Sequence, residues 1–86
     1  MLTDTLIIGG GLSGLALAAK LAAQGRDFLL VEARDRLGGR ILTVREGAAH
    51  FDLGPTWFWP GQPRIAALTE RLGLSRFDQF CQGDVI

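Results

Sequence analysis

Residues 5–14 read TLIIGGGLSG, a short apolar run that is followed directly by three glycines and, after two more residues, by a fourth. A continuous run of apolar and β-branched residues that stops at glycine is typical of a strand buried on both faces and ended by a tight turn. We therefore predict a strand over residues 4–8, with the glycines in the turn that follows it.

The residues after this turn predict a helix and a second strand. Residues 12–24 are rich in alanine and leucine, and Gly25 stands where a helix needs a left-handed residue to end. Because the apolar residues cover more than one helix face, the helix is expected to be largely buried. Residues 28–31 repeat the apolar run. A strand, a helix and a strand within about 30 residues predict a right-handed parallel βαβ unit.

Two smaller elements are predicted further along the chain. Residues 41–45 and 49–53 are extended stretches around a turn at Glu46-Gly47, which favours an antiparallel hairpin. The spacing of apolar residues, with proline at the start and glycine after the end, predicts an amphipathic helix over 63–72. Residues 75–86 show no periodicity, although their last three resemble the start of a strand.

Composition bounds the function. The 86 residues can form at most one small domain or part of a larger one, and their 48% hydrophobic content indicates a packed structure. Nine basic residues balance nine acidic ones, so there is no basic field for nucleic acid or an anionic membrane. The single cysteine, Cys81, cannot form an internal disulfide and is expected to be a small buried apolar residue. No targeting or membrane segment stands out, and a cytoplasmic location is expected.

The glycines also form a chemical motif. Gly9-x-Gly11-x-x-Gly14 matches the dinucleotide-binding fingerprint, which requires a strand before it, a helix after it and an acidic residue near the end of the next strand. Glu32 lies at that position, 18 residues after Gly14. Gly9 allows the tight turn, Gly11 lets a pyrophosphate approach the backbone, and Gly14 lets the helix pack closely on the strand.

The same motif assigns polar contacts. The N–H groups of Leu12 and Ser13 lie in the first helical turn, where they are unpaired and suited to a diphosphate. Glu32 would accept hydrogen bonds from ribose hydroxyls and repel a 2′-phosphate, so that NADP should bind poorly. Since Glu32 sits at a strand end, we expect its replacement to affect the cofactor and hardly the folding. The fingerprint alone does not separate FAD from NAD.

A longer match points to FAD. Residues 32–40, EARDRLGGR, followed by Thr43, resemble the extended second-strand signature of the flavin-containing amine oxidase superfamily. Residues 51–57 are similar to the family's segment near the flavin, and residues 64–74 to the helix after it. The resemblance extends over most of the chain in the family's order.

The resemblance implies roles for individual residues. Arg40 would lie against the FAD pyrophosphate, Arg34 at the adenosine end, and Gly38 and Gly39 would bring backbone close to the cofactor. Fingerprint and resemblance together give these candidate FAD-binding residues: Gly9, Gly11, Leu12, Ser13, Gly14, Glu32, Ala33, Arg34, Gly38, Gly39, Arg40, Gly54, Pro55, Thr56 and Trp57.

Some assignments remain open at this level. Arg36 is either a cofactor contact or part of a solvated basic loop, and the aromatic residues 57–59 either shape the flavin cavity or belong to a core. His50 has no partner at metal-binding spacing, and no catalytic residue can be named.

The expected fold class is α/β: the N-terminal βαβ portion of a Rossmann-like FAD/NAD(P)-binding domain, with a small β-hairpin and a second helix, residues 1–86 being a partial domain. Two functions follow. The first is the FAD-binding N-terminal part of a flavin-dependent oxidoreductase, most like an amine oxidase, acting on an unknown small molecule and inactive as this chain alone. The second is a non-catalytic nucleotide-binding or self-associating module.

Overall fold

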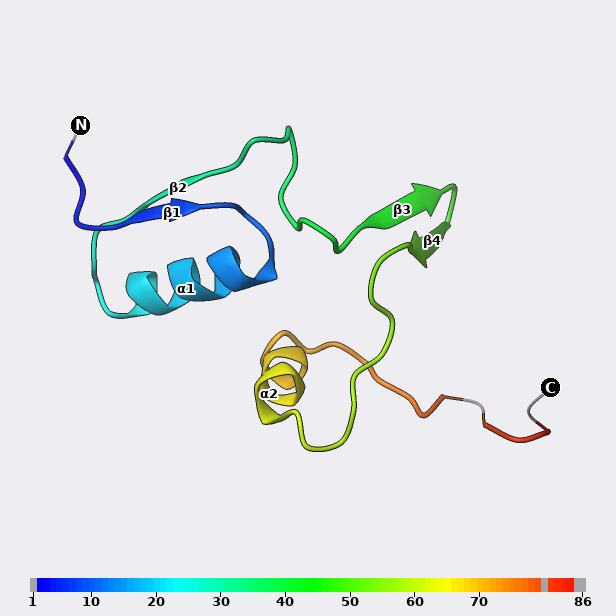
Figure 1. The fold of residues 1–86 in the computed structure, drawn as a ribbon. Helices are drawn as coiled ribbons and strands as arrows, with labels where there is room; N and C mark the ends of the chain where they lie inside the picture. Colours follow the sequence, from blue (N-terminus) through cyan, green and yellow to red (C-terminus); the bar gives the residue numbers. More distant parts are fainter. Residues whose placement is uncertain (1, 80, 85–86) are drawn as a thin grey trace. The chain divides into compact units, whose positions relative to one another are not determined.

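The computed structural model describes residues 2–79 and 81–84 and confirms the α/β class. The chain divides into two compact units, one ending at Thr56 and the other beginning at Trp57, and each is described by itself. That residues 1–86 belong to one partial domain stays a prediction. The elements follow one another as β1 (Leu6–Ile8), α1 (Leu12–Ala23), β2 (Leu29–Val31), β3 (Thr43–Glu46), β4 (Ala49–Asp52) and α2 (Pro63–Arg71) (Figure 1).

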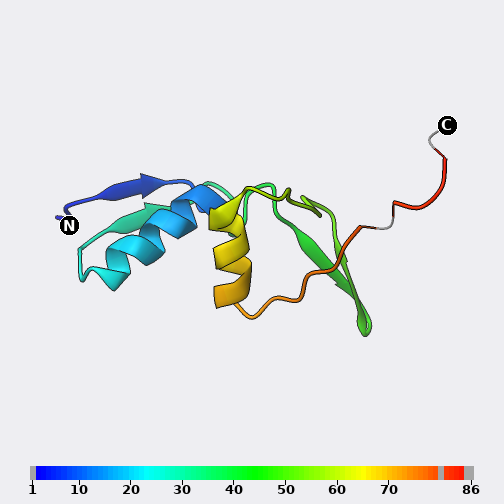
Figure 2. The ribbon, with the colours of Figure 1, turned by 90° about the horizontal axis from the view of Figure 1, so that it is seen from below.

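The predicted βαβ unit forms the beginning of the first compact unit. β1 and β2 pair in parallel, with Leu6 opposite Leu29 and Ile8 opposite Val31. The helix α1 connects the two strands and lies along them, as Figures 1 and 2 show. Both strands are shorter than predicted because only three residues of each find partners in a two-stranded ladder. One contact extends the pairing, since the Leu29 N–H donates to the Thr5 carbonyl at 2.9 Å.

The core between sheet and helix is small. The expectation that β1 is buried on both faces is wrong for this chain, since Ile8 is 82% exposed. The expectation of a largely buried α1 is also wrong, since Leu17 is 46% exposed. The reason is that one helix covers one face of two strands, and the described part of the chain has no second layer for the other apolar surfaces. The buried hydrophobic residues in the described part of the chain are Ile7, Ala18 and Leu21, with Phe28 and Leu30 packed against them.

Both helices end as predicted, at glycines in the left-handed region. Gly25 has φ +67° and Gly73 has φ +68°. In α1 the Gly25 N–H donates to the Ala22 carbonyl at 3.0 Å, and the next N–H donates to the Leu21 carbonyl at 3.0 Å. These two bonds form a Schellman motif, which satisfies carbonyls that the helix leaves unpaired. Each helix ends one residue before the predicted limit, because that residue is the C-cap.

The predicted hairpin is present, with a shifted turn. β3 pairs antiparallel with β4, and Gly47-Ala48 form the turn instead of Glu46-Gly47. Gly47 has φ +57°, which places the glycine where a two-residue turn needs a left-handed conformation. The Thr43 hydroxyl donates across the strands to Asp52 Oδ1 at 2.5 Å. His50 is exposed in this hairpin.

The second unit contains α2 and irregular segments on both sides of it. Pro63 is the first residue of α2, as predicted, and the Gln62 side chain before it accepts a hydrogen bond from the Trp59 N–H at 2.8 Å. The Arg76 guanidinium lies over the Phe58 ring, 6.0 Å from its centroid.

Cys81 corrects a further expectation. The thiol is exposed rather than buried, because the described residues after α2 form no helix or strand that could cover it. The predicted strand start at residues 84–86 falls mostly outside the described residues. Among those described, no helix is long and apolar enough to cross a membrane. Residues 2–79 and 81–84 also contain no group of three or more His, Cys, Asp or Glu side chains that could hold a metal ion.

Candidate cofactor-binding site

The glycine turn between β1 and α1 has the geometry that the fingerprint requires. Gly9 has φ +106°, and its N–H donates to the Val31 carbonyl at 2.8 Å, so the turn is attached to the end of β2. A methyl group on Gly14 would overlap the Gly9 carbonyl oxygen and lie 3.3 Å from the Ile7 side chain. Only glycine at position 14 therefore allows α1 to start so close to β1.

A second glycine turn lies directly against the first. Gly38 and Gly39 have φ +107° and +60°, conformations that other residues rarely adopt. The Gly38 N–H donates to the Gly10 carbonyl at 2.8 Å, and Gly11 and Gly38 form an isolated parallel bridge. A methyl group on Gly39 would lie 3.2 Å from the Gly11 Cα. At Gly11 and Gly39 the two turns thus meet backbone to backbone.

The helix α1 begins directly after this contact. Its N-cap is Gly11, with φ −79° and ψ −173°, and no side chain caps the helix. The first turn also carries no acidic residue. The N–H groups of Leu12 and Ser13 thus have no side-chain partner at the positive end of the helix dipole. This combination of bare backbone, uncapped donors and a first turn without an acidic residue fits a diphosphate.

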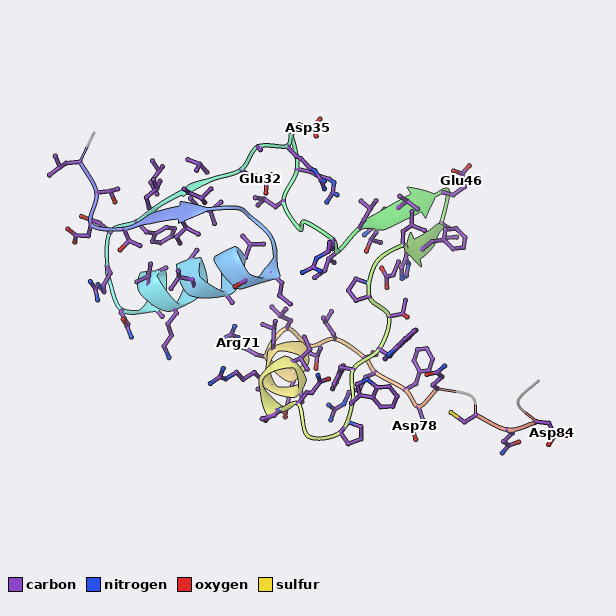
Figure 3. All side chains as sticks on the ribbon, viewed as in Figure 1. Glu32, Asp35, Glu46, Arg71, Asp78 and Asp84 are labelled. Atoms are coloured by element: carbon purple, nitrogen blue, oxygen red, sulfur yellow. The ribbon has the colours of Figure 1, made fainter. Side chains whose placement is uncertain are left out.

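Glu32 follows β2, and its carboxylate connects the first glycine turn with the loop after β2. Its Oε1 accepts a hydrogen bond from the Gly10 N–H at 2.9 Å, and its Oε2 accepts one from the Arg34 N–H at 2.8 Å. These N–H groups, that of Arg34 first, lower the pKa of the Glu32 carboxyl because they favour its charged form. Figure 3 labels Glu32 and, further along the same loop, Asp35.

The bonds of Glu32 correct one expectation. Its replacement was expected to leave folding nearly unchanged, but the carboxylate holds the glycine turn to the loop after β2. The role in ribose binding is compatible with these bonds, since each carboxylate oxygen has a second lone pair. Glu32 is therefore both a structural residue of the loops and a candidate ligand.

The remaining predicted residues divide into two groups. Ala33, Arg34 and Arg40 are exposed on the loop after β2. Gly54 packs on the backbone of that loop, since a methyl group there would overlap the Arg40 carbonyl oxygen and lie 3.1 Å from the Ile41 Cα. Pro55 and Thr56 follow in exposed coil, whereas Trp57, 64% exposed, begins the second unit.

Two residues outside the predicted set also contribute. Gly10 is buried, and a methyl group there would lie 2.5 Å from Leu37 Cδ2 and 3.4 Å from Leu30 Cδ2. Gly10 stands at a position where the fingerprint allows any residue, so the motif does not predict a role for Gly10. The nearest signal is the run of three glycines itself. Arg36 contacts the second glycine turn through its guanidinium.

A parallel βαβ unit with a glycine turn, an uncapped helix N-terminus and an oriented carboxylate at the next strand end is a dinucleotide-binding unit. The comparison with known proteins specifies which kind. The model of the flavin containing amine oxidoreductase family matches residues 12–84, and the chain belongs to that family. The flavin expected from the sequence is thereby confirmed at the level of the family.

Individual relatives agree with this membership. The chain is 47% identical over 75 residues to the flavin-containing amine oxidase A of Canis lupus familiaris, covering 86% of the chain and 14% of the dog protein. A solved triple mutant of putrescine oxidase superposes with a TM-score of 0.82 at 38% identity, over 94% of the chain and 18% of that structure. A fatty acid isomerase from P. acnes matches with a TM-score of 0.71 at 26% identity. This match covers 85% of the chain and 18% of the isomerase. The chain thus spans less than a fifth of these relatives.

The contact between the glycine turns gives a first prediction. Gly11→Ala should fold, at a cost of about 1 kcal/mol or less, because its new methyl meets only the Gly39 Cα at 3.9 Å. FAD affinity should nevertheless fall about tenfold or more, because the methyl occupies the approach to the bare backbone. Gly14→Ala should instead destabilise the fold by about 1–3 kcal/mol or more, through overlap with backbone. Thermal unfolding and flavin-fluorescence titration measure the two effects, and a Gly11→Ala protein with unchanged FAD affinity contradicts the assignment.

The lowered pKa of Glu32 gives a second prediction. A carboxyl with a lowered pKa in the folded state adds stability above its unfolded pKa and loses it as the pH falls through the folded value. Glu32→Gln should therefore be less stable than the wild type near neutral pH. The difference in free energy of unfolding between the two proteins should become smaller as the pH falls. Urea unfolding across the pH range measures this difference. A difference that stays constant down to about pH 3 contradicts the prediction.

Proposed function

We propose that this chain is the FAD-binding N-terminal part of a flavin-dependent amine oxidoreductase. The observation that carries the proposal is the backbone contact of Gly11 with Gly38 and Gly39 beside an uncapped helix N-terminus. Such a surface accepts a diphosphate without steric hindrance and with unpaired N–H donors. Family membership favours FAD over NAD.

In this proposal different residues bind different parts of the cofactor. Leu12 and Ser13 would bind the pyrophosphate through backbone N–H groups, and Arg40 would neutralise it with a forked guanidinium. Glu32 would accept the ribose hydroxyls, and Arg34 would lie at the adenosine end. The segment from Gly54 to Trp57 would lie near the flavin ring. When bound, FAD supplies the acceptor for a hydride from the substrate.

The substrate class proposed for the whole protein is an amine. The support comes from relatives named as amine oxidases and a putrescine oxidase. A fatty acid isomerase contains a similar segment, so this arrangement of elements occurs in proteins with more than one kind of chemistry. Substrate choice would then depend on residues other than these, because the chain's candidate residues address the cofactor.

A competition experiment tests the cofactor assignment. If the chain binds FAD through its ADP half, ADP should displace FAD and riboflavin should hardly do so, since the candidate residues address pyrophosphate and ribose. Flavin fluorescence during titration with either competitor measures this. Riboflavin competing as well as FAD itself would overturn the assignment, and the absence of any FAD binding by the whole protein would overturn the proposed function.

Self-association is a second candidate function for the isolated chain. The observation that favours it is the apolar surface of β1 and α1, where Ile8 is 82%, Leu6 55% and Leu17 46% exposed. Exposed apolar area next to strand edges promotes association between copies. Exchange of strands between identical chains would supply the missing layer at low cost.

Light scattering at micromolar concentration tests this candidate. The isolated chain should be a dimer, a swapped assembly or an aggregate, because a monomer leaves these residues in water. Ile8→Lys, which places a charge on the most exposed residue of β1, should lower the apparent mass without changing the βαβ pairing. A monodisperse wild-type monomer with a cooperative thermal transition is the result that contradicts self-association.

A further inference from the structure

The loop after β2 contains a cation whose partners are backbone carbonyls. The Arg36 Nη2 donates to the Gly39 carbonyl at 2.9 Å. Its Nη1 donates, at longer distances, to the carbonyls of Leu37 at 3.3 Å and Ile41 at 3.5 Å. The short bond fixes the guanidinium, and the two longer ones share a single nitrogen. Arg36 thus lies inside the curve of the loop that it belongs to.

These carbonyls surround the second glycine turn. The turn is closed by the Ile41 N–H, which donates to the Gly38 carbonyl at 3.0 Å. Its other connection is the Gly38 N–H, which donates to the Gly10 carbonyl at 2.8 Å. Carbonyl oxygens gathered on one side of a tight turn repel one another unless a donor pairs with them. A guanidinium, with five N–H groups in a planar fork, can pair with several at once.

From these contacts we propose that Arg36 is a positioning residue of the dinucleotide site. Its guanidinium holds the Gly38–Gly39 turn against Gly11, and it acts on the cofactor only through that turn. The inference rests on the proposed function, because the turn matters to a cofactor only if the site binds one. It differs from both roles considered for Arg36 from the sequence, a direct cofactor contact and a solvated basic residue.

The geometry favours this role over the two others. A phosphate ligand would present its forked nitrogens outward, whereas both terminal nitrogens of Arg36 donate to the loop. A solvated arginine would be exposed, whereas Arg36 is half-buried while its neighbours Arg34 and Arg40 are exposed. Three arginines in a seven-residue stretch thus separate into two exposed candidates for the cofactor and one that organises the loop.

Three variants of the whole protein separate charge from hydrogen bonding. Arg36→Met removes both, Arg36→Lys keeps the charge without the fork, and Arg36→Gln keeps neutral N–H donors without the charge. Arg26→Met is the matched control, since it removes a cation from an exposed residue between α1 and β2, outside the loop that follows β2.

The first measurement uses no flavin. Hydrogen exchange of the Gly38 and Ile41 amides in the apoprotein should become about tenfold faster or more in Arg36→Met and stay unchanged in Arg26→Met. Unchanged exchange in Arg36→Met overturns the proposal. Because this result does not depend on FAD, it remains decisive even if the wild type fails to bind FAD and the proposed function falls.

The second measurement is the dissociation constant of FAD as a function of salt. Arg36→Met should weaken binding about tenfold or more, with Arg36→Gln retaining more affinity than Arg36→Met. The salt dependence of binding should stay as in the wild type, because no cofactor phosphate loses its cation. If Arg36→Lys binds like the wild type, Arg36→Gln binds like Arg36→Met and the salt dependence flattens, then Arg36 binds phosphate directly and the proposal is overturned.

Discussion

Two turns of the main chain, one after β1 and one after β2, approach each other so closely that a Cβ on Gly39 would lie only 3.2 Å from the Gly11 Cα. The Gly38 N–H donates to the Gly10 carbonyl, and Gly39 lies against Gly11. Other features of the site depend on this approach. Glu32 reaches the Gly10 N–H from the end of β2, and the helix begins at an uncapped glycine beside the second turn. A side chain at Gly39 would push the turns apart, and one at Gly11 would cover the surface offered to a diphosphate.

The parts of the fold that could be predicted from sequence are those fixed by local backbone chemistry. Gly25 and Gly73 end their helices in the left-handed region because a Cβ disfavours it. The fingerprint and the acidic residue 18 positions after Gly14 predicted the βαβ unit, since this spacing matches a strand, a tight turn, a helix and a second strand. The match of residues 32–40 to a flavoprotein signature was confirmed by the family model.

The parts that could not be predicted depend on packing and on contacts between separate segments. Burial of β1, α1 and Cys81 was overestimated, because apolar composition shows that a residue can be buried and not that another layer is present to bury it. The paired role of Glu32 and the inward position of Arg36 arise from loop conformations that residue spacing does not encode. Gly10 was overlooked because the motif leaves its position unspecified.

The two turns are joined by a main-chain hydrogen bond from the Gly38 N–H to the Gly10 carbonyl, and this bears on the rates at which the proposed cofactor would exchange. A site that needs no rearrangement before it accepts its ligand has an association rate set by diffusional encounter and orientation. Differences in affinity among variants that preserve the turns then fall on the dissociation rate, and therefore on how long a cofactor stays bound. In the proposed site, substitutions that leave the Gly10–Gly38 contact intact would therefore change mainly the residence time of the cofactor.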